Sequence, residues 1–168
     1  MLIRPTRRLY ISDIDTAKSE HAAFDLIITC GPQSAGAEIL TTTEAKVTHV
    51  HLVCGPGKIG SRQLRHELPK LTTALEGFLS EEKNTASRIL VACPTGKDHS
   101  VGAALAVLCL YADDEGALRS GHGESKDGHQ RAMNKHFIKQ RLSWIMVSIP
   151  DANPARATLQ SVNAFLLA

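Results

Sequence analysis

The sequence has no apolar run long enough to cross a membrane, because the longest one, residues 101–112, is too short for a bilayer. It also lacks an apolar N-terminal signal stretch, an internal repeat and a low-complexity tract. No close pair occurs among its cysteines, which are Cys30, Cys54, Cys93 and Cys109. These absences predict a chain without a membrane partner, in a reducing, cytoplasmic compartment.

Neither sign of charge dominates the sequence. Its 168 residues include 19 basic and 17 acidic side chains, for a formal net charge of +2. That average does not by itself imply a nucleic-acid partner. Hydrophobic residues make up 43% and charged residues 21%, which excludes a disordered or collagen-like chain and predicts a globular domain.

The order of apolar segments predicts an α/β fold with a mostly parallel central sheet flanked by helices. Strands are expected at residues 9–11, 24–30, 47–54 and 89–93. The segment 89–93 is apolar throughout, as a central strand covered on both faces should be. Residues 1–8 are expected to form a loose arm before a single domain of residues 9–168.

Helical spacing of apolar residues predicts the helices. They are expected at residues 15–23, at 61–78, at 100–111, at 133–145 and after Asn153-Pro154. Ser61 is expected to cap the second of them, and Pro69 to kink it or divide it in two. In the last, Asn153 is the expected cap and Pro154 the first helical residue. Residues 33–45 and 113–128 are expected to be loops.

The most informative segment is Cys93-Pro94-Thr95-Gly96-Lys97-Asp98-His99-Ser100, between a predicted buried strand and a predicted buried helix. The start of a helix offers unpaired N–H groups and partial positive charge, which suit an anion. Gly96 lets the backbone curl, Lys97 adds positive charge, and Ser100 can cap the helix or donate to a phosphate oxygen. The alternative is an ordinary turn with a buried cysteine. The candidate phosphate-binding residues are Cys93, Thr95, Gly96, Lys97, His99 and Ser100.

The order strand, C-x-x-G-x-x-x-S, helix resembles the phosphate loop of cysteine-dependent protein phosphatases, and residues 9–14 resemble the first strand of dual-specificity phosphatases. Two features differ from that family. His99 stands at the position of the family's loop arginine, and a neutral imidazole cannot grip a phosphoryl group as a guanidinium does. Residues 55–60, where the general acid would lie, contain no carboxylate. Phosphatase activity through a Cys93 thiolate is therefore the least favoured function.

Longer segments resemble the C-terminal, phosphatase-like domain of the initiator-tRNA 2′-O-ribosyl phosphate transferase family. They are Gly96-Lys97-Asp98-x-Ser100-Val101-Gly102, residues 61–65 with Leu68-Pro69, residues 138–142 and residues 153–163. The resemblance implies a cysteine-phosphatase-like fold and a pentosyltransferase of tRNA modification. Such enzymes move ribosyl phosphate from phosphoribosyl pyrophosphate to the 2′-hydroxyl of a T-stem adenosine in initiator tRNA. The family's larger N-terminal domain is absent from this sequence, so a separate or missing domain is an expected partner.

This reaction needs a cradle for the donor phosphate, a cation for the leaving pyrophosphate and a base near the 2′-hydroxyl. We expect Mg²⁺ to enter with the donor, and we expect neither a protein metal site nor a bound organic cofactor. Asp98 is unusual in an anion cradle, because its carboxylate repels an anion. It either ties the loop through backbone N–H groups or acts as the base, and we favour the tie. A non-catalytic module that binds tRNA or phosphate is the alternative function.

Two basic stretches predict a surface for tRNA phosphates. The first, residues 58–70, contains a single acid, Glu67, and the second, residues 129–150, contains none. Arg156 lies in the first turn of a predicted helix, where the dipole disfavours a cation, so it meets either a phosphate or a salt-bridge partner. The alternative for the stretches is an ordinary solvated helix face. The candidate tRNA-binding residues are Arg62, Arg65, Arg131, Lys135, Lys139, Arg141 and Arg156.

Overall fold

The computed structural model describes residues 1–36, 47–121 and 133–168. Its sheet has four parallel strands in the order β1-β4-β2-β3, which are β1 (Leu9–Asp13), β2 (Leu26–Gly31), β3 (Thr48–Val53) and β4 (Ile89–Cys93). This parallel sheet confirms the predicted α/β fold. Both inner strands, β2 and β4, are buried along their whole length, as the apolar sequence of 89–93 predicts.

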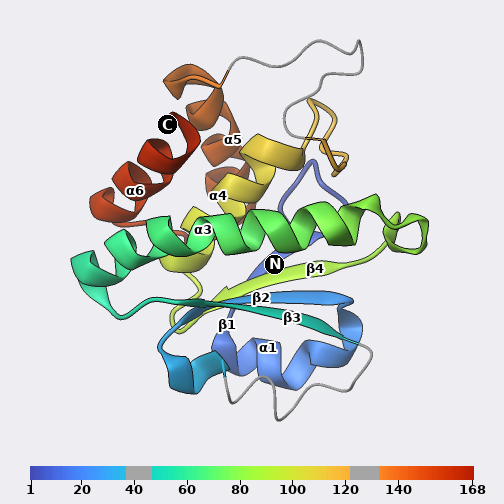
Figure 1. Ribbon diagram of the computed structural model, residues 1–168, viewed down its shortest axis with the longest axis horizontal. Coiled ribbons are helices and arrows are strands. Elements are labelled where there is room, and N and C mark those ends of the chain that lie inside the picture. Colours follow the sequence, from blue (N-terminus) through green and yellow to red (C-terminus); the bar gives the residue numbers. More distant parts are fainter. Residues whose placement is uncertain (37–46, 122–132) are drawn as a thin grey trace.

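The helices form layers on both faces of the sheet (Figure 1). On one face lies α1 (Ile14–Glu20), which packs against β1 and β4. On the other face lie α3 (Gly57–Ser80), α4 (His99–Tyr111), α5 (Lys135–Ser148) and α6 (Arg156–Leu166). Short 3₁₀ turns follow α1 and α3, at His21–Ala23 and Glu82–Asn84.

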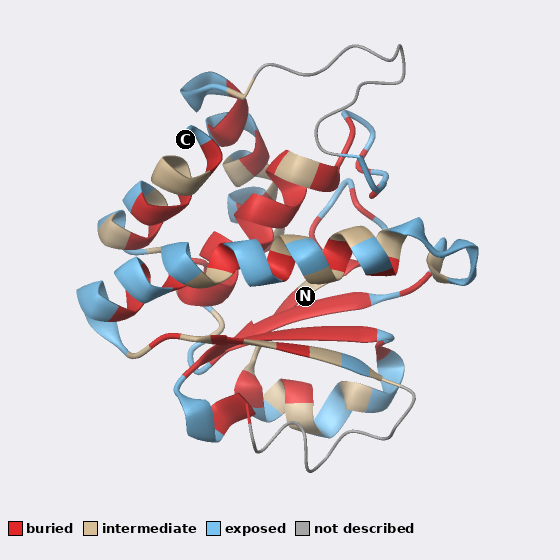
Figure 2. Ribbon diagram, in the orientation of Figure 1, coloured by how far each residue is buried: buried red, intermediate tan, exposed pale blue. Residues whose placement is uncertain are grey.

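Side chains on alternate sides of the inner strands fill two cores. Ile28 and Val91 belong to the large core beneath α3 and α4, whereas Ile27 and Leu90 belong to the small core beneath α1. Burial is concentrated in the sheet and in α4 (Figure 2). Every residue of α4 except Leu110 is buried, because the sheet, α3, α5 and α6 surround this helix. The loop before α4 is therefore anchored on a rigid strand and a rigid helix.

The N-terminal segment differs from the prediction, because residues 1–8 are not a loose arm. Ile3 is fully buried in the large core, and its N–H donates to the Leu9 carbonyl at 2.9 Å. Leu2 also forms an antiparallel bridge with Tyr10. The apolar side chains between the basic residues provide the burial that holds this segment on β1.

Two helix starts also differ from the predictions. Helix α3 begins at Gly57, and Ser61, the expected cap, is buried inside it and donates to the Gly57 carbonyl at 3.2 Å. Pro69 does not divide α3, which continues to Ser80 because its apolar stripe packs on the core. Helix α6 begins at Arg156, so Asn153-Pro154 lies before the helix and not at its cap.

The expected loops lie partly beyond the described residues. Residues 33–36 are helical rather than loop, and residues 37–46 are not described. The loop of residues 113–128 is described as far as residue 121. Within the described ranges, the length and composition of the helices do not allow any of them to span a membrane.

Candidate functional site

The carboxyl ends of the parallel strands meet at one edge of the sheet. Strand register pairs Asp13 with Cys93, and Gly31 with Val53. Ligands of open α/β sheets bind at this edge. A cavity of about 310 Å³ opens here, and its lining includes Gly31, Cys54, Cys93, Thr95, Asp98 and His99. We call it the thiol cavity.

The loop between β4 and α4 curls around the Cys93 thiol. Sγ of Cys93 accepts the Gly96 N–H at 3.2 Å and lies 3.0 Å from Ser100 Oγ. Gly96 has a φ of +70°, and a Cβ there would lie 2.8 Å from Asp13 N. A glycine is therefore required where the loop turns against the end of β1. Thr95 Oγ1 lies 3.8 Å from the same sulfur and accepts the Lys97 N–H at 3.2 Å.

The start of α4 supplies donors beside this thiol. The backbone N–H groups of Asp98, His99 and Ser100 have no acceptor in the part of the chain that the structure describes. Unpaired N–H groups at a helix start carry partial positive charge, and the exposed Lys97 ammonium adds to it. This arrangement is chemically able to hold a phosphate or another small anion.

His99 does not replace the missing loop arginine. Its side chain is buried, with Nδ1 3.7 Å from Cys54 Sγ and Nε2 3.4 Å from Ser61 Oγ. The ring therefore forms part of the cavity wall and contacts both the end of β3 and α3. Burial raises the pKa of Cys54 to about 12, so this neighbouring thiol stays protonated near neutral pH. The described lining of the thiol cavity contains no arginine and no carboxylate except that of Asp98.

Asp98 is bonded to the segment that begins α6. Its Oδ1 accepts the Ala155 N–H at 2.8 Å and the Thr158 hydroxyl at 2.6 Å. One residue earlier in the loop, the Lys97 carbonyl accepts the Asn153 N–H at 2.9 Å. The geometry supports a tie, although the tie reaches a distant helix rather than the loop's own backbone.

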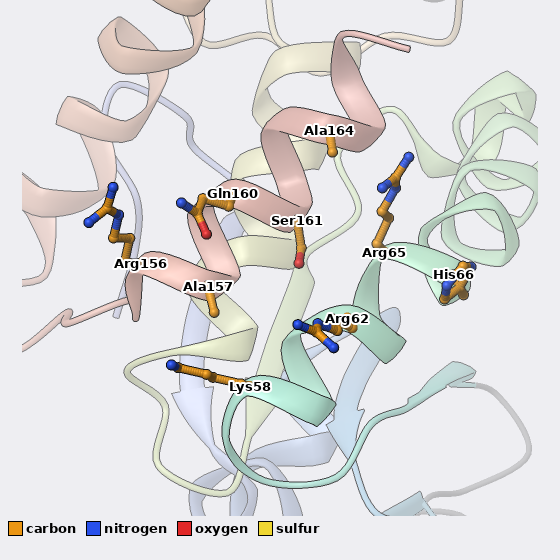
Figure 3. A pocket seen from close by; sticks show the side chains of 9 residues that line it. All are labelled: Lys58, Arg62, Arg65, His66, Arg156, Ala157, Gln160, Ser161 and Ala164. Atoms are coloured by element: carbon orange, nitrogen blue, oxygen red, sulfur yellow. The ribbon is translucent and has the colours of Figure 1, made fainter.

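A second hollow lies between α3 and α6, and we call it the α3–α6 groove (Figure 3). Its volume is about 700 Å³, and its basic or polar lining residues are Lys58, Arg62, Arg65, His66, Arg156 and Gln160. Ser161 is a further polar residue of the lining. Among the described residues, none forms an ion pair with the basic side chains of the groove. Glu67 does not line the groove, because its Oε1 accepts the Val53 N–H at 3.0 Å. The groove is therefore a concentrated positive surface.

The structure separates the candidate tRNA-binding residues into groups. Arg62, Arg65 and Arg156 come together in the α3–α6 groove. Lys135 and Lys139 are exposed on α5, away from that lining. Arg131, on the same stretch, lies outside the described residues.

Arg141 is not a surface residue, which corrects its prediction as a tRNA contact. Its side chain is 3% exposed, and Nη2 lies 3.0 Å from Asp114 Oδ1. Its guanidinium carbon stacks 4.5 Å from the ring centre of Phe137 and 4.0 Å from that of Trp144. Position 141 falls on the apolar face of α5, so the long side chain is held within the fold.

Lys58 and His66 belong to the predicted basic stretch 58–70, and both line the groove. Two further residues were not predicted. Gln160 lines the groove, and Thr158 links Asp98 to Ser61 through hydroxyl contacts of 2.6 and 2.9 Å. Gln160 follows Arg156 by one helical turn, so helical spacing alone could have placed the two together. No local pattern connects Thr158 with Asp98, which lies far away in the sequence.

Comparison with solved structures defines the class of fold. The phosphatase domain of Yvh1 from Chaetomium thermophilum matches with a TM-score of 0.65 and 18% identity, covering 97% of this chain and 92% of that one. Human DUSP28 matches with a TM-score of 0.64 and 15% identity, covering 99% and 93%. The protein therefore has the fold of dual-specificity phosphatases, as predicted.

Sequence comparison then identifies the family. Residues 48–166 match the family model of the Rit1 DUSP-like domain, and the chain belongs to this family. The tRNA A64-2′-O-ribosylphosphate transferase of Saccharomyces cerevisiae is 32% identical over 110 residues, which is 66% of this chain. The match covers 20% of the yeast protein, so the chain spans about a fifth of the length of that relative.

Proposed function

We propose that this chain is the phosphatase-like part of a pentosyltransferase that modifies initiator tRNA in the cytoplasm. The donor is phosphoribosyl pyrophosphate, and the acceptor is the 2′-hydroxyl of a T-stem adenosine. Family membership and the name of the yeast relative support this function. The structural observation that carries it is the loop of residues 93–100. This loop contains no arginine, it offers backbone N–H donors without an acceptor among the described residues, and its carboxylate, Asp98, is bonded to the α6 segment.

In this transfer, the adenosine 2′-oxygen forms a bond to C1′ of the donor ribose. The bond from C1′ to the pyrophosphate oxygen breaks with its electron pair, and the 2′-hydroxyl proton passes to a base. Gly96, Lys97 and Ser100 hold the donor's 5′-phosphate, and Cys93, Thr95 and His99 surround that phosphate. Cys93 does not attack the phosphate in this reaction, because bonds form and break only at C1′ and no bond to the 5′-phosphorus changes.

Mg²⁺ would enter with the donor, and its charge would offset the negative charge of the departing pyrophosphate. The described residues contain no group of three or more His, Cys, Asp or Glu side chains able to hold a metal ion. We therefore assign no step to a metal held by side chains of this chain. The cation belongs with the donor substrate.

Asp98 serves as a tie in this proposal. One carboxylate oxygen accepts two hydrogen bonds from the α6 segment, as a tie requires. Asp98→Asn preserves an acceptor oxygen and removes the basicity. A transfer-active chain should therefore retain activity in Asp98→Asn, and a loss of several orders of magnitude with tRNA binding intact would identify Asp98 as the base.

A non-catalytic module that binds tRNA or phosphate is the second candidate. It is favoured by the same engagement of Asp98, because the described lining of the thiol cavity then offers no free carboxylate base. A transfer assay separates the two functions. The purified chain is incubated with unmodified initiator tRNA, phosphoribosyl pyrophosphate and Mg²⁺, and the digested tRNA is analysed by mass spectrometry.

A ribosyl-phosphate adduct on adenosine supports transfer by this chain, and elongator tRNA is the matched control. Retained tRNA binding without an adduct, in a folded protein, assigns this chain to the binding module. Hydrolysis of an aryl phosphate that is lost in Cys93→Ser would instead identify a phosphatase. We expect no such hydrolysis, because the described lining of the thiol cavity contains no arginine and no carboxylate except that of Asp98, which is bonded to the α6 segment.

A further inference from the structure

The α3–α6 groove has the shape and charge of a site for a nucleic-acid backbone. Lys58, Arg62 and Arg65 lie at spacings of four and three residues, so they share one face of α3. They extend over roughly 10 Å of helix, at about 1.5 Å per residue. A row of cations of this length can contact several phosphates of one strand.

The opposite wall of the groove adds a cation and leaves space for a ligand. Arg156 and Gln160 come from α6, and the side chains between the two helices are small, namely Ala157, Ser161 and Ala164 (Figure 3). Small side chains allow a sugar–phosphate backbone to approach, and Gln160 can donate to a phosphate oxygen. Cations without carboxylate partners release counterions when they bind phosphates, which favours a polyanion.

Asp98 holds the wall that carries Arg156. Its Oδ1 bonds the residues on both sides of Arg156, through the Ala155 N–H at 2.8 Å and the Thr158 hydroxyl at 2.6 Å. Thr158 in turn lies 2.9 Å from the hydroxyl of Ser61, next to Arg62 on α3. This chain of contacts fixes the distance between the two cationic walls.

We infer that the α3–α6 groove binds the phosphodiester backbone of RNA, and that Asp98 is the positioning residue that places Arg156 opposite Arg62. The choice of RNA as the polyanion rests on the proposed function. The inference explains why an acidic side chain is present in a loop that binds anions. Asp98 Oδ1 is engaged by the α6 segment and so supports a second anion site.

The groove is tested by titrating the full chain with a fluorescent RNA hairpin of the initiator T-stem at several salt concentrations. One phosphate contact contributes about 0.9 to the slope of log affinity against log salt. Arg62→Ala or Arg156→Ala should therefore reduce the slope by about one and weaken binding roughly five- to tenfold at 0.1 M salt. Lys83→Ala removes one positive charge just beyond the far end of α3 and should leave binding unchanged.

The positioning role is tested with Asp98→Ala and Asp98→Asn. Simple electrostatics predicts that Asp98→Ala, by removing a negative charge, binds RNA more tightly. A positioning role predicts the opposite, a roughly five- to tenfold weakening with a smaller salt slope, and recovery in Asp98→Asn, which keeps the acceptor oxygen. Thr158→Val tests the same tie without changing the charge. It replaces Asp98→Ala in the test if circular dichroism shows that Asp98→Ala is unfolded.

Native affinity in the folded Arg62→Ala and Arg156→Ala variants would overturn the groove as the RNA site. Native or tighter binding in Asp98→Ala, with an unchanged slope, would overturn the positioning role. Displacement of RNA by polyglutamate at equal charge concentration would assign the groove to an acidic protein partner instead. RNA binding without transfer contradicts transferase activity of the chain alone but leaves the groove intact, so the two proposals fail separately.

Discussion

Arg141 is basic but buried, so truncating it should affect the stability of the fold and not RNA binding. Its guanidinium lies between the rings of Phe137 and Trp144 and donates to the Ala112 carbonyl at 3.3 Å. Arg141→Ala removes all of these contacts at once. We expect a less stable protein that binds RNA normally as long as it is folded.

The magnitude follows from the individual contacts. Each cation–π contact contributes about 0.5–2 kcal/mol, and the truncated side chain leaves a space between two rings. The ion pair with Asp114 contributes little, because that carboxylate is 80% exposed and screened by water. The expected loss is about 2–4 kcal/mol of unfolding free energy. At about 2–4 °C per kcal/mol for a domain of this size, the melting temperature should fall by roughly 5–15 °C.

The measurement is thermal and urea unfolding of the native chain, Arg141→Ala and Lys139→Ala. Lys139 is exposed on the same helix, so its truncation should change the free energy of unfolding by less than about 0.5 kcal/mol. RNA affinity is then measured well below the melting temperature of each variant. An Arg141→Ala protein with native stability and weakened RNA binding would refute the structural role that the contacts imply.

The remaining predictions concern packing, pH and thiol reactivity. Gly102→Ala should destabilise the protein by about 1–3 kcal/mol in urea unfolding, because its Cβ would lie 2.7 Å from Thr158 Cγ2; native stability would show that α6 can shift at no cost. Burial, with smaller effects of nearby cations, lowers the pKa of His49 to about 4. As the pH falls, His49 is therefore protonated in the unfolded chain before it is protonated in the folded one. The free energy of unfolding should be at its full value above about pH 6.5 and should decrease towards pH 4, with a smaller decrease in His49→Gln. A His49 that titrates near its ordinary pKa in an NMR measurement would contradict this. Burial raises the pKa of Cys54 and Cys109 to about 12, so neither should react with iodoacetamide at pH 8 until the protein unfolds; mass spectrometry showing native labelling of either would disprove the burial.

Elements with a strong local signal could be predicted from the sequence. The apolar segment 89–93 and the helix that follows it have compositions typical of a buried strand and a buried helix. Gly96 indicated the turn between them, because the backbone there needs a left-handed conformation. The strand, turn and helix that form this loop were therefore predictable, whereas its binding of a phosphate stays a prediction.

Features that depend on distant contacts could not be predicted in this way. The segment of residues 1–8 is short and basic. It is held in place because Ile3 is buried against strands and helices elsewhere in the chain. Arg141 has the charge of a surface residue, and only the packing of α5 shows that Phe137 and Trp144 enclose it. The partners of Asp98 lie on α6, so its role depends on a contact that no sequence spacing encodes.

The positions of the charges suggest how a phosphatase-like fold can serve a different purpose. At the thiol cavity, the buried His99 stands at the position of the loop arginine of cysteine-dependent phosphatases, and Lys97 is the nearby cation of the loop. Arg62, Arg65 and Arg156 lie instead in the α3–α6 groove, which the Asp98–Thr158–Ser61 contacts connect to the loop. A cavity with weak positive charge suits a single phosphate but not a phosphoryl transition state, because stabilising that state needs fixed charge at the reacting group. A groove whose cations form no ion pair with other described residues suits a long polyanion. Asp98 belongs to the loop and bonds the α6 wall of the groove, so the two proposals together predict that a change at either proposed anion site is detectable at the other.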